Sequence, residues 1–176
     1  MTAAFPAMNY RTDKELRAAI ADIKASSSKP FGVNLIVNKS NPSYKSHLET
    51  LLELRVDYII TSLGSPREVI ERCKPLGIKV FCDVVDLPYA KKVEELGADA
   101  VIAVNSRAGG HAGNIPPQEL ITLLRDNCNI PIIAAGGVSK GKHLKQMIGW
   151  GAAGASVGTI FIAARKRIFR PSISRP

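Results

Sequence analysis

The 176-residue sequence has few cysteines and no long apolar segment. Its three cysteines, Cys73, Cys82 and Cys128, include no C-x-x-C pair, which argues against a disulfide framework and a zinc site and fits a reducing compartment. The longest apolar run, 152–164, is interrupted by glycine, serine and threonine, and no signal-peptide pattern begins the chain. We therefore expect a cytoplasmic, unexported protein with no metal ligand set and no membrane partner.

Acidic residues are also scarce. Lysine and arginine number 24 against 15 aspartates and glutamates, so the formal net charge is +9. Five of these cations fall within residues 165–176, which leaves a charge of only +4 for the rest of the chain. A net charge of this size is typical of an ordinary solvated surface, so no nucleic-acid partner is expected. The sequence divides into a domain over residues 1–164 and a basic tail over 165–176 that we expect to be disordered.

Hydrophobic residues alternate along the chain between a period of about 3.6 and short continuous runs, a pattern typical of amphipathic helices between buried parallel strands. Thr12 with Glu15, and Ser65 with Glu68, predict capping boxes at two helix starts. Prolines open most of the other helices, and Ser139 is expected to cap the last full one. The strands are expected at 32–37, 56–62, 78–85, 100–104, 131–135 and 155–160.

Six strands and six helices in strict alternation specify an α/β fold with a parallel sheet. An open doubly wound sheet and a (β/α)8 barrel both satisfy this order. A complete barrel usually needs about 250 residues, so on count alone the chain lacks two βα units.

Two glycine clusters follow the last two expected strands, at 132–138 and 154–159. Glycine lets backbone N–H groups approach a phosphate without a Cβ in the way. Either cluster alone is typical of a tight strand-to-helix turn. Together they occupy the positions where barrel enzymes bind a phosphate, so the pair predicts a phosphate site.

A third glycine cluster, 108–113, places His111 in a loop that follows a strand. Flanking glycines leave the imidazole free to point into a pocket, and the carboxyl ends of parallel strands carry the chemistry in such folds. These features favour a functional role for His111. By contrast, His47 and His143 fall on helix positions that we expect to be solvated, and neither is given a role.

Four further side chains have simpler explanations. Asp83 and Asp86 sit at the end of a strand and could enter the same site, although capping of the next helix explains Asp86 equally well. Cys82 and Cys128 have no basic neighbour in the sequence and are expected to be inert core thiols.

On these residues the chain resembles the nitronate monooxygenases, formerly called 2-nitropropane dioxygenases, which are themselves similar to FMN-dependent enoyl-ACP reductases. The resemblance runs from about residue 6 to 164 and is most specific in the block A-G-G-H-A-G at 108–113. Other matching blocks are P-A-M-N-Y-R-T, P-F-G-V-N-L, I-A-A-G-G-V and residues 151–161. The resemblance implies an incomplete (β/α)8 TIM barrel of about six parallel βα units, with the first one or two strands missing.

The resemblance also implies the site of an FMN-dependent oxidoreductase that oxidises nitronates or nitroalkanes with O₂. His111 would be the catalytic base, removing the proton beside a nitro group or orienting the anionic nitronate. The cofactor-binding positions would be Asn34, Gly109, Gly110, Gly136, Gly137, Ser156, Val157, Gly158 and Thr159.

Other functions stay open at this point. The same flavin fold could take electrons from NAD(P)H and pass them to an enoyl thioester, as in the similar reductases. A non-catalytic fragment that keeps only a phosphate-binding half-site is the third possibility. Residues 104–107 also depart from the family's glycine-containing approach to the histidine block. An open barrel edge would expose backbone groups, so self-association through that edge is expected.

Overall fold

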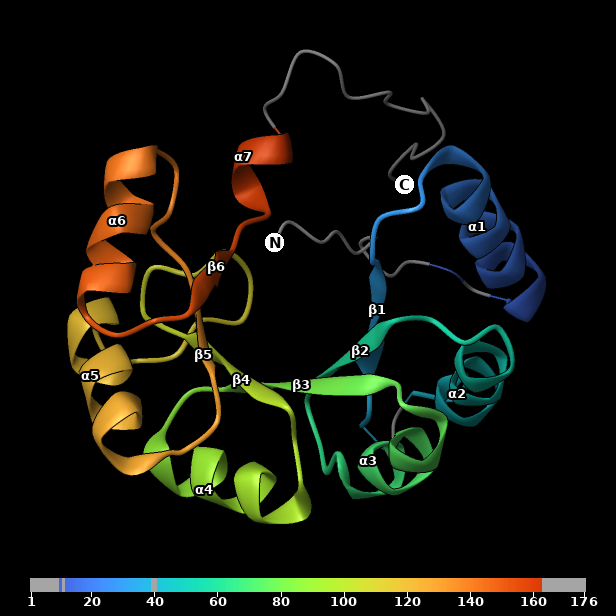
Figure 1. The fold of residues 1–176 in the computed structure, drawn as a ribbon, viewed down its shortest axis with the longest axis horizontal. Coiled ribbons are helices and arrows are strands. Elements are labelled where there is room, and N and C mark those ends of the chain that lie inside the picture. The colour runs from blue at the N-terminus through green and yellow to red at the C-terminus, as the bar shows by residue number, and fades with distance from the viewer. Residues whose placement is uncertain (1–9, 11, 39–40, 163–176) are drawn as a thin grey trace, which may run out of the picture.

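Six parallel strands form one continuous sheet that curls into an open half-barrel (Figure 1). The computed structural model describes residue 10 and residues 12–38 and 41–162. Neighbouring strands in the sheet follow chain order, so every connection is a βα crossover. The strands are β1 Gly32–Ile36, β2 Tyr58–Ser62, β3 Lys79–Val84, β4 Ala100–Val104, β5 Ile132–Ala135 and β6 Gly154–Ser156. The expected incomplete barrel of six parallel βα units is confirmed.

The helices α1 to α6 cover the outer, convex face of the sheet, whereas α7 follows the end of β6 (Figure 1). They alternate with the strands along the chain, and a short 3-10 helix, η1, extends the third of them. Their bounds are α1 Asp13–Ser26, α2 Tyr44–Glu53, α3 Arg67–Cys73, η1 Lys74–Leu76, α4 Leu87–Leu96, α5 Pro117–Asn127, α6 Gly141–Gly149 and α7 Thr159–Ile162.

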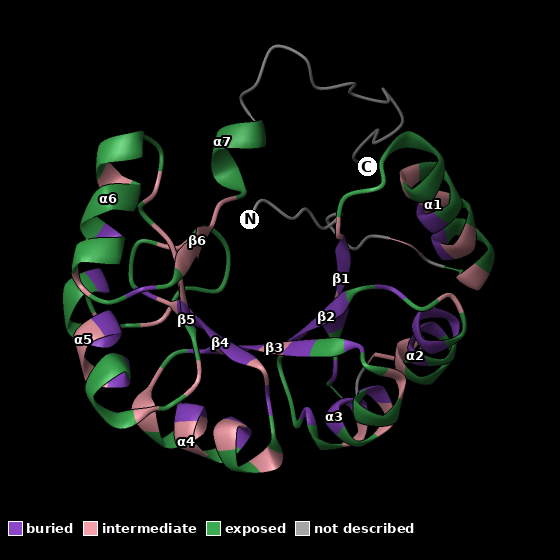
Figure 2. Cartoon of the chain, viewed as in Figure 1, coloured by how far each residue is buried: buried purple, intermediate pink, exposed green. Residues whose placement is uncertain are grey.

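Alternate residues of each strand face the two sides of the sheet, and the main core lies between strands and helices. Val33, Ile59 and Val101 point outward from the barrel and are fully buried under helix residues such as Leu48 and Leu120. Burial in Figure 2 is deepest along β1 to β4 and thins towards β6 and α7. The structure is therefore anchored mainly by its first four strands and their helices.

A smaller apolar cluster lines the inside of the half-barrel. Tyr58, Ile60 and Ile102 are buried there, and Tyr58 stacks on Phe81 with ring centroids 5.0 Å apart. Tyr58 is the first residue of β2, so the stacked rings lie towards the amino ends of the strands. The other end, at the carboxyl ends of the strands, is left for the loops.

Several predicted helix signals are confirmed. The Thr12 hydroxyl accepts a hydrogen bond from the Glu15 N–H at 3.3 Å, and the Asp86 carboxylate accepts one from the Tyr89 N–H at 2.8 Å. Gly97 ends α4 in the left-handed conformation with φ of 95°. Asp86 is therefore a helix cap.

Other predicted signals are wrong. The expected capping box at Ser65 does not form, because Pro66 takes the cap position before α3 and no side chain caps it. Lys140, and not Ser139, precedes α6. The last strand ends at Ser156 and not at residue 160, because β6 has a hydrogen-bonding neighbour on one side only among the described strands, and the chain then turns into α7.

His47 is not solvated as expected but buried, with 3% of its surface exposed. It lies on the inner stripe of α2, one turn from Leu51, and its Nε2 is 3.7 Å from the Asp13 carboxylate of α1. The stripe of α2 residues that faces the core therefore includes His47.

Three sequence-based expectations fall outside the described residues: the resemblance block at 6–12 apart from Tyr10 and Thr12, the domain end at 164 and the tail over 165–176. Within the described part of the chain, no helix combines the length and the apolar character needed to cross a bilayer.

The cap at Asp86 gives a stability prediction. Asp86→Ala should lower the free energy of unfolding by about 1 kcal/mol, because the first N–H groups of α4 lose their acceptor. Asp86→Asn should restore most of this loss. Urea denaturation measures both variants, with Asp22→Ala on the exposed side of α1 as the control. A wild-type midpoint for Asp86→Ala would contradict the capping role.

Candidate functional site

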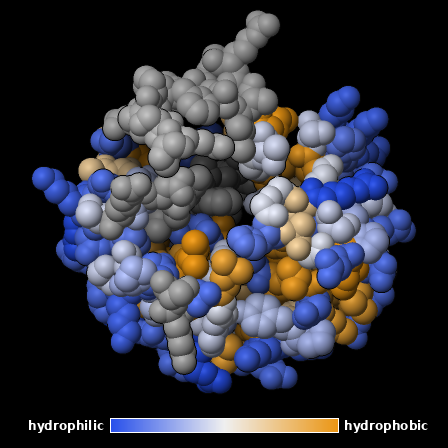
Figure 3. Space-filling view, turned by 180° about the vertical axis from the view of Figure 1, so that it is seen from behind, coloured by the Kyte–Doolittle hydropathy of each residue, from blue (hydrophilic) through white to orange (hydrophobic). Residues whose placement is uncertain are grey.

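A cavity of about 1140 Å³ opens at the carboxyl ends of the strands. In Figure 1 the helices α1 to α6 follow one another clockwise, and right-handed crossovers make this the view onto the amino ends of the strands. Figure 3 therefore looks onto the carboxyl ends, where the surface is hollowed and bordered in part by hydrophobic residues. All six strands, or the loops that follow them, contribute to the lining.

The floor of the cavity is apolar over most of its area. Inward-facing strand residues supply it, namely Ile60 from β2, Ile102 and Val104 from β4 and Ala135 from β5. Ile36 extends the same surface from β1. A flat, apolar ring system would bury its faces well against such side chains.

A polar row crosses this floor from β1 to β3. The Ser62 Oγ lies 2.8 Å from the Asn34 Oδ1 and 2.5 Å from the Asp83 Oδ2. Burial raises the pKa of the Asp83 carboxyl, and the hydrogen bond with Ser62 opposes this only in part. All three side chains line the cavity.

The bend after β5 is held against the loop that follows β4. Gly136 has φ of 112°, and a Cβ at this position would lie 2.5 Å from the backbone nitrogen of Ala108. Only glycine permits this approach. The neighbouring Gly137 lies over Arg107, because a Cβ there would be 3.1 Å from the Arg107 Cδ.

Asn105 joins the same two segments from below. Its side chain is fully buried, its amide donates to the Gly136 carbonyl at 3.2 Å, and its Oδ1 accepts from the Arg107 N–H at 2.9 Å. The Ser106 N–H also donates to the Ile115 carbonyl at 2.9 Å, which closes the base of the loop. The bond between the Asn105 amide and the Gly136 carbonyl therefore joins the two segments beside the cavity.

The chain after β6 completes this side of the cavity. A Cβ on Gly109 would lie 2.8 Å from the Thr159 Oγ1, so the histidine-bearing loop closely approaches the start of α7. A Cβ on Gly158 would meet no atom within 4 Å, so open space lies in front of this glycine. The backbone here is accessible to a ligand.

The rim of the cavity carries positive charge. Lys92 of α4 and Arg107 line it, and the exposed His111 lies on the same loop as Arg107. The one described carboxylate in the lining is Asp83, on the floor. This distribution favours an anionic ligand near the mouth.

Nine of the ten predicted site residues line this one cavity, although they come from four separate segments of the chain. Gly110 is the exception: it lies beside the lining with φ of 85°. Sequence reasoning did not identify Ser62 or Asn105. Both come at or directly after the end of a strand, where a polar residue is a usable signal.

The cysteines lie outside the lining. Burial raises the pKa of the Cys73 thiol to about 12 and that of the Cys82 thiol to about 11, and the Thr61 hydroxyl lies 3.2 Å from the Cys82 Sγ. Burial also raises the pKa of Cys128. Thiols with so little thiolate at neutral pH are poor nucleophiles, which agrees with the expected inert role.

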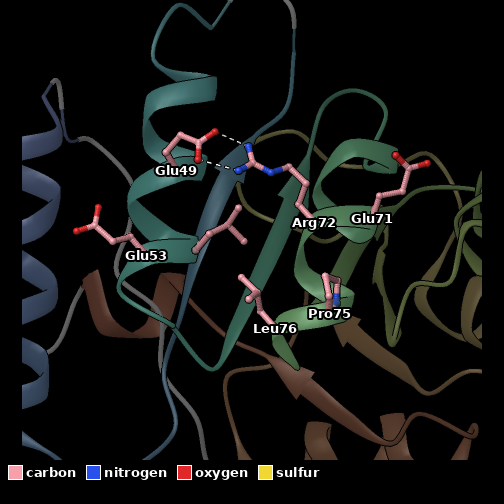
Figure 4. A pocket seen from close by; sticks show the side chains of 7 residues that line it. Glu49, Glu53, Glu71, Arg72, Pro75 and Leu76 are labelled. Atoms are coloured by element: carbon pink, nitrogen blue, oxygen red, sulfur yellow. Dashed lines mark hydrogen bonds and ion pairs between the residues drawn. The ribbon is translucent and has the colours of Figure 1, made fainter.

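A second depression lies on the outer surface, between α2 and α3 (Figure 4). Arg72 there holds Glu49 through a two-point ion pair, with one N–O distance of 2.7 Å, and the hydrogen bonds lower the pKa of the carboxyl. Both side chains are substantially exposed. The depression is therefore a solvated contact between two helices, on a different side of the sheet from the cavity.

Comparison with known proteins places this geometry in a family. A family model described as nitronate monooxygenase matches residues 39–167. A 5-hydroxy-7a-methyl-1-oxo-octahydro-1H-indene-4-carboxyl-CoA dehydrogenase of Rhodococcus jostii is 33% identical over 162 residues, which cover 92% of this chain and 45% of that protein.

Two solved structures share the fold. FabK from Thermotoga maritima is 32% identical with a TM-score of 0.86, over 92% of this chain and 51% of that one. Nitroalkane oxidase from Streptomyces ansochromogenes is 27% identical with a TM-score of 0.84, over 90% and 58% respectively. The chain thus spans about half the length of these relatives. The match over residues 39–167 shows that the chain belongs to the nitronate monooxygenase family.

Proposed function

We propose that this chain provides the FMN site of a flavin-dependent oxidoreductase that oxidises nitronates or nitroalkanes with O₂. One observation carries the proposal: the glycine bends after β5 and β6 and the loop that bears His111 surround a single cavity with an apolar floor. Family membership supports the reaction class. The cytoplasm is the proposed location.

The cavity fits FMN in its chemistry. Backbone amides of Gly136, Gly137 and the segment 156–159 would hold the phosphate, where open space lies in front of Gly158. The apolar floor would take the isoalloxazine ring, with Asn34 and Gly109 at its polar edge. Bound FMN would supply the electron-transfer chemistry, and O₂ would be the final acceptor.

His111 would act on the substrate at the cationic rim. In its neutral form the imidazole can accept the proton from the carbon beside a nitro group, which leaves an anionic nitronate and an imidazolium. The positive charge of Arg107 and Lys92 on the same rim would stabilise that anion. A substrate that already is a nitronate needs only the orienting role.

A thioester substrate is the alternative. The Rhodococcus jostii relative is named as a carboxyl-CoA dehydrogenase, and it aligns with 92% of this chain. The alternative function would be reduction of an enoyl thioester by NAD(P)H on the same flavin. Oxygen uptake with a nitronate, against NADH consumption with an enoyl thioester, separates the two.

FMN binding is the first expected outcome. Titration of the purified chain with FMN should quench the flavin fluorescence and saturate at one FMN per chain. Flavin absorbance should survive desalting. A chain that leaves the fluorescence of FMN unchanged at all concentrations would contradict the proposed function.

A matched pair of glycine variants tests where the phosphate lies. Gly136→Ala introduces backbone strain of about 1–3 kcal/mol and a contact with Ala108, so FMN affinity should fall at least about tenfold. Gly141→Ala is the control, because a Cβ there meets no atom within 4 Å. Equal affinity of the two variants would contradict the role of the bend.

The role of His111 has its own test. His111→Asn should lower turnover of a neutral nitroalkane by about 100-fold or more, but turnover of the preformed nitronate much less, because only the first substrate needs proton removal. His143→Asn on α6, outside the lining, is the control. Equal losses on both substrates would rule out the base role.

Self-association is part of the proposal. Among the described strands, β1 and β6 each pair on one side only, and an unpaired edge favours pairing with another chain. The expected partner is a second copy. Sedimentation at several concentrations should show a rising average mass, and a constant monomer mass would contradict it.

A further inference from the structure

The polar row on the cavity floor contains three oxygen atoms in sequence, and the short distances between them restrict where the hydrogen atoms can lie. The Asn34 Oδ1, Ser62 Oγ and Asp83 Oδ2 are separated by 2.8 Å and 2.5 Å. Oxygens this close need a proton between each pair. The row therefore requires two protons.

Only one of the two protons comes from Ser62. A serine hydroxyl donates a single hydrogen, and an amide oxygen donates none. If the hydroxyl donates to Asn34, the remaining proton must lie on Asp83, whose protonated carboxyl then donates to Ser62. With the Asn34 oxygen facing Ser62, an ionised Asp83 would leave two lone pairs facing each other across one of these distances.

We propose that Asp83 is a positioning residue: its protonated carboxyl, acting through Ser62, holds the Asn34 amide with its NH₂ group towards the cavity. Asn34 then presents a hydrogen-bond donor to a bound ligand. The identity of that ligand as FMN rests on the proposed function, whereas the position of the proton does not.

The surroundings of Asp83 favour the protonated form. Asp83 faces the apolar floor, and its β4 neighbour in the sheet register is Ile102. No described lysine, arginine or histidine forms an ion pair with it. Burial raises the pKa of this carboxyl, as a site without a compensating cation predicts.

Ionisation of Asp83 would reverse the row. The Ser62 hydroxyl would then donate to the carboxylate, and the Asn34 amide would turn so that its NH₂ donates to Ser62. The amide oxygen would face the cavity in place of the NH₂ group. One proton on Asp83 thus decides whether Asn34 offers a donor or an acceptor.

Protonation of Asp83 makes ligand affinity depend on pH. Ligand affinity should be highest while Asp83 is protonated and should fall as the pH rises through the pKa of that carboxyl. Neighbouring elements contribute other ionisable groups, which the control variants must separate. In the lining, α4 supplies Tyr89 and Lys92, the loop after β4 supplies Arg107 and His111, and β1 and β2 supply none. Cys82 of β3 lies outside the lining but interacts electrostatically with Asp83.

The proton can be located without any ligand. Carbon-13 NMR of the aspartate carboxyls, assigned to Asp83 with Asp83→Asn, should show a protonated carboxyl at neutral pH. Its pKa should lie above the ordinary range of an aspartate carboxyl, as burial requires. A carboxylate that is ionised at neutral pH would overturn the proposal, whether or not the chain binds FMN.

FMN titrations of variants test the consequence. Asp83→Asn keeps a donor to Ser62 and should match wild-type affinity at neutral pH, without the loss at higher pH. Asp83→Ala and Ser62→Ala should each weaken FMN binding by about tenfold, the effect of one lost hydrogen-bond arrangement. Asp22→Asn is the control for the same chemical change on the surface.

The outcomes are distinct. If Asp83→Asn weakens FMN binding as strongly as Asp83→Ala, the proposal is overturned, since a neutral hydrogen-bond donor to Ser62 would then not be sufficient to position Asn34. Wild-type protein that fails to bind FMN, while NMR finds Asp83 protonated, would contradict the proposed cofactor and leave the proton placement supported.

Discussion

The buried amide of Asn105 is the contact on which the site depends. It joins the bend at Gly136 to the loop that carries Arg107 and His111, using its donor for one and its acceptor for the other. Because an unpaired amide without access to water is costly, separating the bend from the loop would leave the buried Asn105 NH₂ group without its acceptor, the Gly136 carbonyl. The Asn105 amide thus links the glycine bend to the histidine loop although they lie in different βα units.

The alternation of helices and strands was predictable from the sequence because it depends on local periodicity. The strand at 100–104 has the predicted bounds, and Asp86 and Gly97 delimit the helix between β3 and β4 as such residues usually do. The errors arise where contacts with other parts of the structure determine where an element begins or ends. Pro66 displaces the cap expected at Ser65, and the last strand ends early because β6 is a sheet edge among the described residues.

For the candidate site, the residues were more predictable from the sequence than the contacts between them. Glycine clusters and a loop histidine are visible as local signals, and they line one cavity because the carboxyl ends of parallel strands share an edge. The contacts of Asn105 with Gly136 and of Ser62 with Asn34 and Asp83 were not predictable, since these partners belong to other βα units. His47 was misjudged because a histidine on an amphipathic helix was assigned by its polarity and not by its position on the inner face.

The uneven thickness of the core bears on how a ligand would be held. Leucine, valine and isoleucine side chains pack deeply along β1 to β4, whereas β6 has only three residues and the residues of α7 whose side chains are described are exposed (Figure 2). The proposed phosphate amides therefore belong to the part of the sheet with the least protection against local opening. An anion bound to both residues 156–159 and the Gly136 bend would connect the sparsely packed β6 and α7 to the well-packed strands. Occupancy of the site by the anion and the conformational order of β6 and α7 would therefore rise together.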